Sequence, residues 1–597
     1  MNPEDMLKMV FIPLKRMLGK LSEKQLLLVL SFVVGIFSGL AAVLLEKAIS
    51  LIHWGLTSWF SHGYDNYLFF FYPGIGMLLS MLFVRYVLKD NIGHGVTKVL
   101  VAVSGNESRI RPHNMWSSML TSAVTIGFGG SVGAEAPIVY TGAAIGSNFG
   151  RYMNMSYRSM TVLLGCGAAG AIAGIFKAPL AGVLFTLEIL LFNISMTSMM
   201  PLLISTVSAT VISYIFMGDS LPFLCSMSPF TLKNIPFYIL LGVFCGGLSV
   251  YFVRTTLWLE DKIGGVRNPF VKWAFCAISL GLLIFLFPPL YGEGYSELTP
   301  LLNGTAISFK GETILSSLMN NPWTLILFFI LVLLLKVFSM TFTNAGGGVG
   351  GTFGPTLFIG AIAGFVLART INLLLAGSAY TVPEQNFVLV GMAGLMAGVM
   401  QAPMTAIFLI AEMSGGYELF IPLIITAAIA FGTTRIFEQY SIYTKRIAKT
   451  GDLLTHDSDQ AVLTLLKITD LIETDFLPLS IDDTLGQIVN VVSRSKRNIF
   501  PVLDSKEHFQ GYISLEDIRK DMFLTDQYDK LHVFNYMKSI SEYVYEDEKM
   551  ESVMRKFEKS GAWNLPVVRK DRTYVGFVSK SKIFSAYRDE LKVLSQD

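Results

Sequence analysis

An acidic residue stands inside the segment GSVGAEAP (130–137), which is flanked on both sides by long apolar runs. This residue, Glu135, is the only charge in the segment and lies between a glycine-rich stretch and Pro137. A charge at the centre of a bilayer costs about 2.5–3.5 kcal/mol or more, so acids that persist there usually have a function. Proline suits the first turn of a helix, and glycines allow unusual backbone conformations. The segment therefore predicts a helix that begins at a carboxylate inside the membrane.

A second glycine-rich segment, GGVGGTFGP (347–355), matches GGSVGAEAP (129–137) and has Phe353 opposite Glu135. The first backbone amides of a helix have no partner within that helix, and the helix dipole adds partial positive charge. Two such helix starts inside a membrane can bind one anion without a lysine or arginine. A cation site would instead need acidic rings or exposed carbonyls, and this part of the chain has few acids. The two segments predict a shared anion site.

The composition indicates which kind of domain contains these two segments. Only 15% of the 597 residues are charged and 52% are hydrophobic, whereas soluble proteins average about 25% charged residues. Half of the charged residues follow residue 450. This asymmetry predicts a polytopic α-helical membrane domain followed by a soluble domain. Basic residues before the first apolar run place the N-terminus in the cytoplasm; they are Lys8, Lys15, Arg16, Lys20 and Lys24.

The membrane part contains a duplication. GAAGAIAGIFKAP (167–179) and GMAGLMAGVMQAP (391–403) align without gaps, and each copy ends shortly before an acid, Glu188 or Glu412. Short, glycine-interrupted apolar pieces in matching halves are typical of the binding site of a transporter. The sequence therefore predicts two repeats of broken, tilted helices.

The tail contains a second duplication, in which residues 499–518 and 564–583 share the order strand, turn, strand, helix. We expect an α/β tail with two copies of this unit. The predicted boundaries are 1–24 for a cytoplasmic segment, 25–447 for the membrane domain with repeats 25–220 and 235–447, 448–465 for a linker, and 466–597 for the tail with copies 466–525 and 533–592.

On these motifs the chain resembles the CLC family of chloride channels and proton/chloride exchangers. GAEAP and GTFGP resemble the second and third signature segments of the family, GHGVT (93–97) the first, and SIYTKRI (441–447) its late tyrosine segment. The tail resembles a CBS pair, the cystathionine-β-synthase-type module. The resemblance implies the CLC fold and transport of chloride or a similar monovalent anion. It also implies a homodimer with one pore per subunit in the cytoplasmic membrane, cytoplasmic CBS domains and no required cofactor. The sequence contains no basic patch interleaved with aromatic residues, so we expect no nucleic-acid partner.

The resemblance also assigns roles to residues. Glu135 is the gating glutamate, whose carboxylate competes with chloride until protonation releases it. The implied anion-binding residues are His94, Gly95, Ala134, Glu135, Ala136, Thr352, Phe353 and Tyr443. His94 replaces a serine whose hydroxyl faces the central anion in the family. Either the imidazole contributes to binding and makes transport pH-dependent, or the ring turns away and backbone amides form the site.

Coupling to protons stays open at this point. Exchangers of the family usually carry a second, proton-carrying acid where this chain has Ile189, directly after Glu188. An isoleucine cannot carry a proton, which favours an uncoupled channel, whereas a proton route through Glu135 and Glu188 is compatible with exchange. Glu188 and Glu412 also fit an interpretation as structural acids at helix ends.

CBS pairs often bind adenine nucleotides through a Ser/Thr-x-x-Asp stretch, which Ser514 and Asp517 preserve, whereas the second copy has Ser579 and Lys582. We expect at most one nucleotide site. Two other functional classes are disfavoured. A CBS-containing divalent-cation transporter needs several acids facing a pore, and an embedded enzyme needs a nucleophile–base pair or a metal cluster. The seven histidines show neither spacing, so we expect no enzyme and no metal site.

Overall fold

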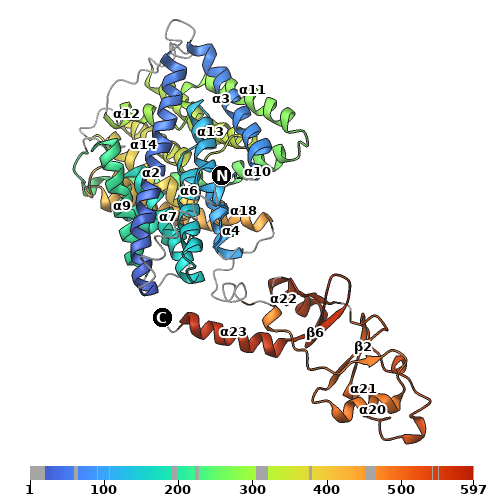
Figure 1. The fold of residues 1–597 in the computed structure, drawn as a ribbon. Helices are drawn as coiled ribbons and strands as arrows, with labels where there is room; N and C mark the ends of the chain where they lie inside the picture. Colours follow the sequence, from blue (N-terminus) through green and yellow to red (C-terminus); the bar gives the residue numbers. More distant parts are fainter. Residues whose placement is uncertain are drawn as a thin grey trace. The chain divides into compact units, whose positions relative to one another are not determined.

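The structure is a computed structural model that divides into two compact units, Met1–Leu454 and Thr455–Asp597 (Figure 1). The described residues are 21–58, 65–90, 92–105, 108–190, 198–221, 223, 227–303, 321–375, 380–450, 466, 468–540, 542–548 and 550–595. Most of the predicted N-terminal segment and linker therefore lies outside the described residues.

The first unit is helical. Its α-helices are α2 (Glu23–Ser58), α3 (Asp65–Leu82), α4 (Gly95–Gly105), α5 (Ser117–Gly127), α6 (Glu135–Tyr152), α7 (Tyr157–Phe176), α8 (Pro179–Phe185), α9 (Met199–Met217), α10 (Ile235–Gly264), α11 (Pro269–Leu286), α12 (Tyr295–Asn303), α13 (Pro322–Ala345), α14 (Phe353–Leu374), α15 (Glu384–Met400), α16 (Pro403–Met413), α17 (Phe420–Phe437) and α18 (Ile442–Thr450). Short π-helical turns follow α3 and α8, at Phe83–Leu88 and Thr186–Leu190, and 3-10 turns occur at Pro112–Met115, Leu232–Asn234 and Pro288–Leu290.

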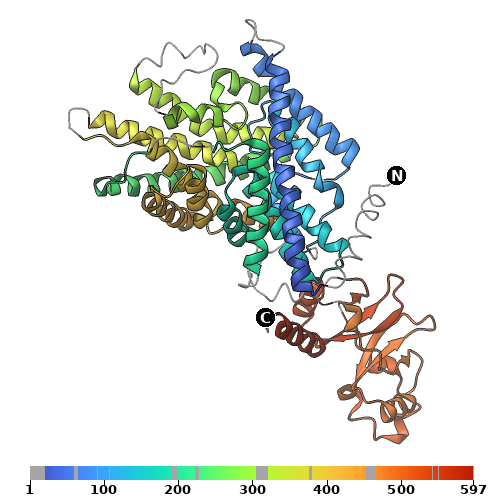
Figure 2. The same cartoon turned by 60° about the vertical axis from the view of Figure 1, so that its left-hand side comes forward.

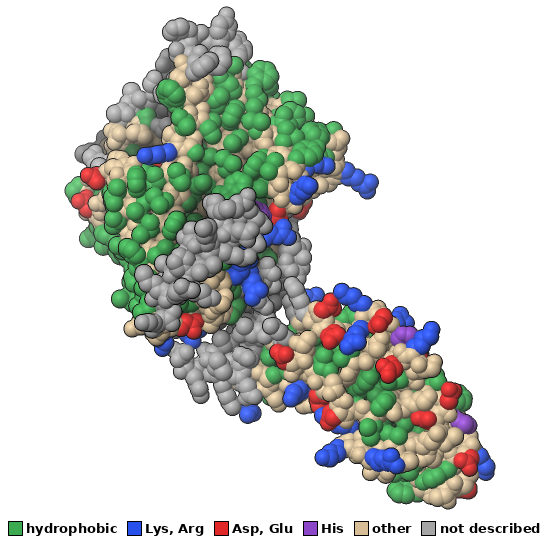
Figure 3. All heavy atoms as spheres, in the orientation of Figure 1, with side chains coloured by type: hydrophobic (Ala, Val, Ile, Leu, Met, Phe, Trp, Pro, Cys, Tyr) green, Lys and Arg blue, Asp and Glu red, His purple; other side chains and the backbone are tan. Residues whose placement is uncertain are grey.

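Within the described residues, nine helices or helix pairs are long and apolar enough to span a membrane. Helices α4, α8, α15 and α16 are shorter. Apolar side chains cover much of the surface of this unit in Figure 3. Its exposed apolar residues include Leu44, Ile215 and Ile436, which is 79% exposed. Such a surface is stable against lipid, and helices satisfy their backbone hydrogen bonds there. The protein is a multi-pass membrane protein.

The two halves of this unit pack in the same way. α6 packs on α7 as α14 packs on α15, and α2 packs on α9 as α10 packs on α17. The long helix α2 lies against α7 and α9 (Figures 1 and 2), and the short helices α8 and α16 contact each other across the halves. The predicted fold class, with its internal repeat of broken helices, is confirmed.

Glycines at matching positions permit close helix contacts. A Cβ atom on Gly142 of α6 would lie 2.2 Å from the carbonyl oxygen of Gly167 in α7. In the second half, a Cβ atom on Gly360 of α14 would lie 2.5 Å from the carbonyl oxygen of Gly391 in α15. Small residues allow helix backbones to approach this closely in membranes. The aligned glycine-rich runs therefore encode the same helix contact twice.

The second unit holds two three-stranded sheets of the same topology, with orders β1-β2-β3 and β4-β5-β6. In each sheet the first strand runs parallel to the second, and the second runs antiparallel to the third. The elements are β1 (Leu479–Ser480), α20 (Leu485–Arg494), β2 (Ile499–Leu503), β3 (Phe509–Ser514), α21 (Leu515–Ile518), β4 (Val544–Tyr545), α22 (Met550–Ser560), β5 (Asn564–Val568), β6 (Tyr574–Ser579) and α23 (Lys580–Ser595), with 3-10 turns at Ile468–Asp470, Thr525–Gln527 and Val533–Asn535. The predicted strand, turn, strand, helix order is confirmed in both copies.

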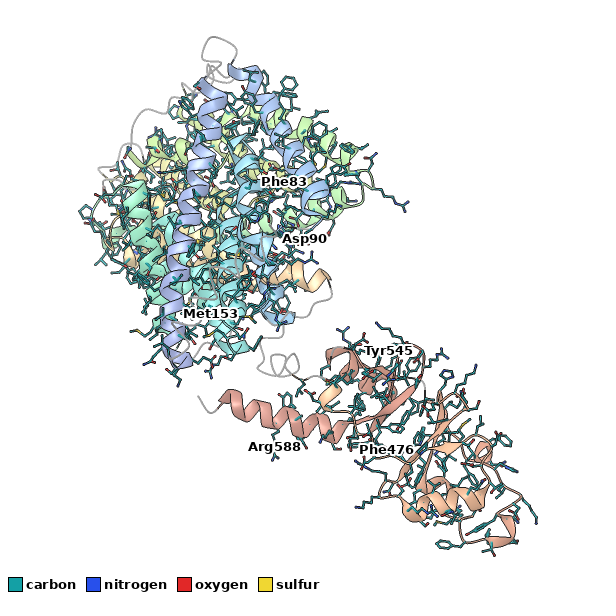
Figure 4. The ribbon with its side chains drawn as sticks, viewed as in Figure 1. Phe83, Asp90, Met153, Phe476, Tyr545 and Arg588 are labelled. Carbon is teal, nitrogen blue, oxygen red and sulfur yellow. The ribbon has the colours of Figure 1, made fainter. Side chains whose placement is uncertain are left out.

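The two copies contact each other within this unit. Glu473 pairs with Phe577 through two backbone hydrogen bonds, and His508 pairs with Thr573 as an isolated bridge. The ring of Phe476, labelled in Figure 4, packs on Phe577 with centroids 4.9 Å apart. The copies thus form one tandem unit.

Candidate functional site

The two glycine-rich segments meet directly before α6 and α14. The N–H of Gly133 donates to the carbonyl of Gly351 at 3.1 Å, and the N–H of Gly351 donates back to Gly133 at 2.7 Å. The two chains run antiparallel at this bridge. The starts of the two helices, at Glu135 and Phe353, are therefore held side by side in the interior of the membrane unit.

A reciprocal pair of hydrogen bonds fixes both segments to the helices before them. The N–H of Ser131 donates to the hydroxyl of Thr343 in α13 at 3.1 Å, and the N–H of Val349 donates to the hydroxyl of Thr125 in α5 at 3.0 Å. Thr125 and Thr343 occupy matching positions in the two repeats, and so do Ser131 and Val349. Because each loop is attached to the opposite half, the helix starts are held in a fixed relative position.

The carboxylate of Glu135 occupies the space between the helix starts. Its Oε2 accepts a hydrogen bond from the N–H of Gly354 at 3.2 Å, and its Oε1 accepts one from the hydroxyl of Tyr295 at 2.6 Å. The Glu135 side chain is only 2% exposed, and no lysine or arginine of the described residues forms an ion pair with it. An anion of the chain itself is therefore held by a backbone amide and a hydroxyl, which is the chemistry that a bound halide needs.

A second carboxylate, that of Glu293, holds the neighbouring amide. Its Oε1 accepts the N–H of Ala134 at 2.8 Å. Neither Glu293 nor Tyr295 was among the predicted site residues. Both belong to the segment YGEGYSE (291–297), an acid between glycines in an otherwise apolar stretch, and an intramembrane acid is the signal that could have identified it.

The start of α4 lies against the same region. A Cβ atom on Gly95 would lie 2.3 Å from the carbonyl oxygen of Ala136, so only glycine fits at this contact. His94, directly before it, adopts a left-handed φ of 56°. The charges of Arg446 and Glu260, which form an ion pair at 2.6 Å, act on the His94 imidazole. The structure thus brings the first signature segment to the start of α6.

The central residues are buried around the start of α14. Thr352, Phe353 and Tyr443 are each at most 2% exposed. The ring of Phe353 stacks on Phe176 with centroids 5.5 Å apart, and the hydroxyl of Tyr443 lies 3.7 Å from the sulfur of Met400 and beside Thr352. The predicted anion-binding residues therefore converge from α4, α6, α14 and α18. Their contact with an anion stays a prediction.

Glu188 and Glu412 lie elsewhere and act as reciprocal helix caps. Glu412 accepts the N–H groups of Leu180 and Ala181 at the start of α8, at 3.1 and 2.9 Å. Glu188 accepts the N–H groups of Met404 and Thr405 at the start of α16, at 3.0 and 2.7 Å. This geometry supports the interpretation as helix-terminus acids. Ile189, next in the chain, is 6% exposed and offers no polar atom to a proton route.

In the CBS pair, Ser514 and Asp517 form a capping box at the start of α21. The Ser514 hydroxyl donates to Asp517 Oδ2 at 2.7 Å, and Lys538 forms an ion pair with the same carboxylate. In the second copy, the Ser579 hydroxyl donates instead to Glu473 at 2.6 Å. Adenine-nucleotide binding at Ser514 and Asp517 stays a prediction.

The Asp517 carboxylate makes the CBS pair sensitive to acid. Although burial alone would raise the pKa of Asp517, hydrogen bonds from Lys538 and Ser514 hold its pKa below the ordinary value. A lowered folded-state pKa gives stability that is present above the unfolded pKa, near 4, and is lost as the pH falls through the folded value. We expect Asp517→Asn to lower the free energy of unfolding by about 1 kcal/mol at pH 6 and by less at pH 3.

Chemical denaturation followed by near-ultraviolet circular dichroism at both pH values measures this difference. The exposed Asp482, replaced by asparagine, is the matched control and should leave the unfolding free energy unchanged at both. An equal loss at pH 6 and pH 3 for Asp517→Asn would contradict a charge-based role.

In the described part of the chain, no group of three or more His, Cys, Asp and Glu side chains could hold a metal ion.

Comparison with known proteins places these features in a family. Residues 75–435 match the family described as voltage gated chloride channel, and residues 468–523 and 533–589 each match a CBS domain. Chloride channel protein CLC-f of Arabidopsis thaliana is 26% identical over 67% of this chain, and the aligned part spans 56% of that protein's length. The H(+)/Cl(-) exchange transporter ClcA of Vibrio cholerae is 26% identical over 71% of this chain and 89% of its own length.

The fold is also that of solved relatives. The crystal structure of a slow cyanobacterial Cl-/H+ antiporter covers 71% of this chain and 97% of its own length, with a TM-score of 0.61 and 24% identity. The helices of the candidate site from α4 to α16 lie within the family match, whereas Tyr443 of α18 follows its end at residue 435. The chain therefore belongs to the voltage-gated chloride channel family, the CLC family, and carries a pair of CBS domains after its membrane unit.

Proposed function

We propose that this protein moves chloride, or a similar monovalent anion, across a membrane through the site between α6 and α14, and that Glu135 is its gate. The observation that carries the proposal is the position of the Glu135 carboxylate on the N–H of Gly354 at the start of α14. The relatives named above are chloride channels and proton/chloride exchangers, which is consistent with an anion as the ion transported.

The gate acts by competition. While Glu135 is ionised, its oxygens hold the N–H of Gly354 and the hydroxyl of Tyr295, and an anion cannot use those donors. A protonated carboxyl group carries no charge and accepts hydrogen bonds more weakly. Protonation therefore favours release of the side chain and binding of an anion at the vacated donors. The hydroxyl of Tyr443 and the start of α4 complete the surroundings of that anion.

Two transport modes are compatible with this gate. The first is proton-coupled exchange, because Glu135 itself takes up and releases a proton. An uncoupled channel is the second, and Ile189 favours it because no acid follows Glu188. The reversal potential of the reconstituted protein under combined chloride and proton gradients separates the two forms. A potential that shifts with the proton gradient indicates exchange, and one that follows chloride alone indicates a channel. Anion flux no greater than in protein-free liposomes would contradict the proposed function.

His94 provides a test of the site from the side of α4. If its imidazole contacts the anion, His94→Ser replaces a titrating group with a neutral hydroxyl donor. We expect anion flux to continue, and its pH dependence between pH 5 and 8 to become flatter only if a bound anion keeps the imidazole protonated in that range. Radiotracer chloride uptake into liposomes across this range measures the effect. An unchanged pH profile would assign the site to backbone amides alone.

We also propose a homodimer in the cytoplasmic membrane with the N-terminus and the CBS pair in the cytoplasm. Apolar side chains on short helices that are exposed in the single chain, such as Leu180 of α8 and Met404 of α16, support a further apolar contact there. Chemical cross-linking in native membranes at dilute expression tests the dimer. A cross-linked band of twice the chain mass is expected.

A further inference from the structure

A cavity of about 170 Å³ lies next to the Glu135 site and is partly open to the outside of the unit. The lining side chains that matter here are Ile49, His53, Ile126, Tyr291, Glu293 and Tyr295. Two of them reach the site, because Tyr295 donates to Glu135 and Glu293 accepts the N–H of Ala134. The cavity therefore has an acid at the point where it meets the amides before α6.

The backbone of this acid is held in place. Gly292 and Gly294 adopt φ values of 59° and 89°, a left-handed conformation that side chains rarely adopt, and this bends the segment so that residues 293 and 295 face one site. Lys336 of α13, fully buried, donates its Nζ to the carbonyl of Gly292 at 2.8 Å. The N–H of Gly292 donates to Gly129 at 3.1 Å. The Glu293 backbone is thus fixed while its side chain borders open space.

The groups around Glu293 carry both signs of charge. Lys336 favours the carboxylate, whereas the carboxylates of Glu135 on α6 and Glu46 on α2 oppose a second negative charge. His53, also on α2, is exposed at the cavity and its ring lies 6.0 Å from that of Tyr291. Among the described residues that line the cavity, the other titratable groups are the phenols of Tyr291 and Tyr295. Glu135 holds the Gly354 amide and Glu293 holds the Ala134 amide, so protonation or displacement of one acid relieves the repulsion on the other.

We propose that Glu293 is a second carboxylate gate, which covers the N–H of Ala134 and must leave it before an anion from the cavity can bind there. This inference rests on the proposed function and adds to it a competing group on the cavity side of Glu135. An anion in the cavity competes with Glu293 for the Ala134 amide, and protonation of Glu293 weakens its hold on that amide. Transport then depends on the pH on the cavity side through a group other than Glu135.

The test compares two substitutions by chloride uptake into liposomes at varied chloride concentration and varied pH on each side. Glu293→Gln keeps the length but removes the charge, so we expect the half-saturating chloride concentration to fall roughly tenfold and its dependence on cavity-side pH to be lost. Glu293→Asp keeps the charge but shortens the side chain by one carbon. We expect it to lower the half-saturating concentration as well while retaining a pH dependence.

Glu384→Gln is the matched control, because this acid starts α15, accepts a hydrogen bond from Arg369 at 3.1 Å and does not line the cavity. It should change neither quantity. Chloride binding to the detergent-solubilised protein, measured by calorimetry, gives the same comparison without transport and shows whether each variant is folded. Unchanged chloride affinity and pH dependence in both Glu293 variants would overturn the inference and leave the proposed function intact. Absence of anion flux in the unmodified protein would instead overturn the proposed function.

Discussion

Anion flux through a Glu135→Gln variant is expected to continue and to depend less on pH. Glutamine has nearly the same size as glutamate, so its carbonyl can still reach the N–H of Gly354, but it carries no charge at any pH. Hydrogen bonds to an ionised acceptor are about twice as strong as neutral ones. The side chain therefore competes less well with chloride, and we expect flux at pH 7 to rise roughly tenfold, which corresponds to about 1.4 kcal/mol.

The same variant should abolish any shift of the reversal potential with a proton gradient, because the proton-binding group of the gate is gone. Flux and reversal potential are measured in liposomes against the unmodified protein. Glu384→Gln is the matched control: this acid starts α15, pairs with Arg369 at 3.1 Å and should have no effect on either quantity. A Glu135→Gln variant that keeps the pH profile of the unmodified protein would exclude Glu135 as the gate.

The helix starts of the site could be predicted from local sequence. Glycines followed by a proline two residues after the key position indicated helices that begin near Glu135 and Phe353, and α6 and α14 begin at those residues. The reason is physical: the missing N–H of proline and the backbone freedom of glycine determine a helix start within a few residues. The duplication of this segment then predicts that the two helix starts converge.

The second acid and the phenol of the site could not be predicted in this way. Glu293 and Tyr295 reach Ala134 and Glu135 from about 160 positions away in the chain. Their place depends on the packing of α12 and α13, which the local sequence does not encode. The pairing of Glu188 with α16 and of Glu412 with α8 is similar: the matching positions indicated a structural role, but only the fold shows that each acid caps the opposite half.

One of the closest helix contacts of the membrane unit predicts a large loss of stability. Gly364 of α14 faces α15 so closely that a Cβ atom would lie 1.9 Å from the carbonyl oxygen of Phe387. At the matching position of the first half, a Cβ atom on Gly146 of α6 would lie 2.0 Å from the carbonyl oxygen of Leu163. Since the obstacle is backbone, a change of rotamer cannot relieve it. The two helices must separate, and packing around the start of α14 loosens with them.

We expect Gly364→Ala and Gly146→Ala each to lower stability by about 3 kcal/mol or more, beyond the usual effect of one added methyl group. Thermal unfolding in detergent, followed by the loss of monodisperse protein, measures the change. Gly247→Ala in α10 is the control, because nothing lies within 4 Å of the added Cβ atom and alanine is the better helix former. Equal effects at positions 146 and 364 would indicate that the duplicated sequence encodes one helix contact used twice, whereas unfolding midpoints like that of the control would contradict the close approach.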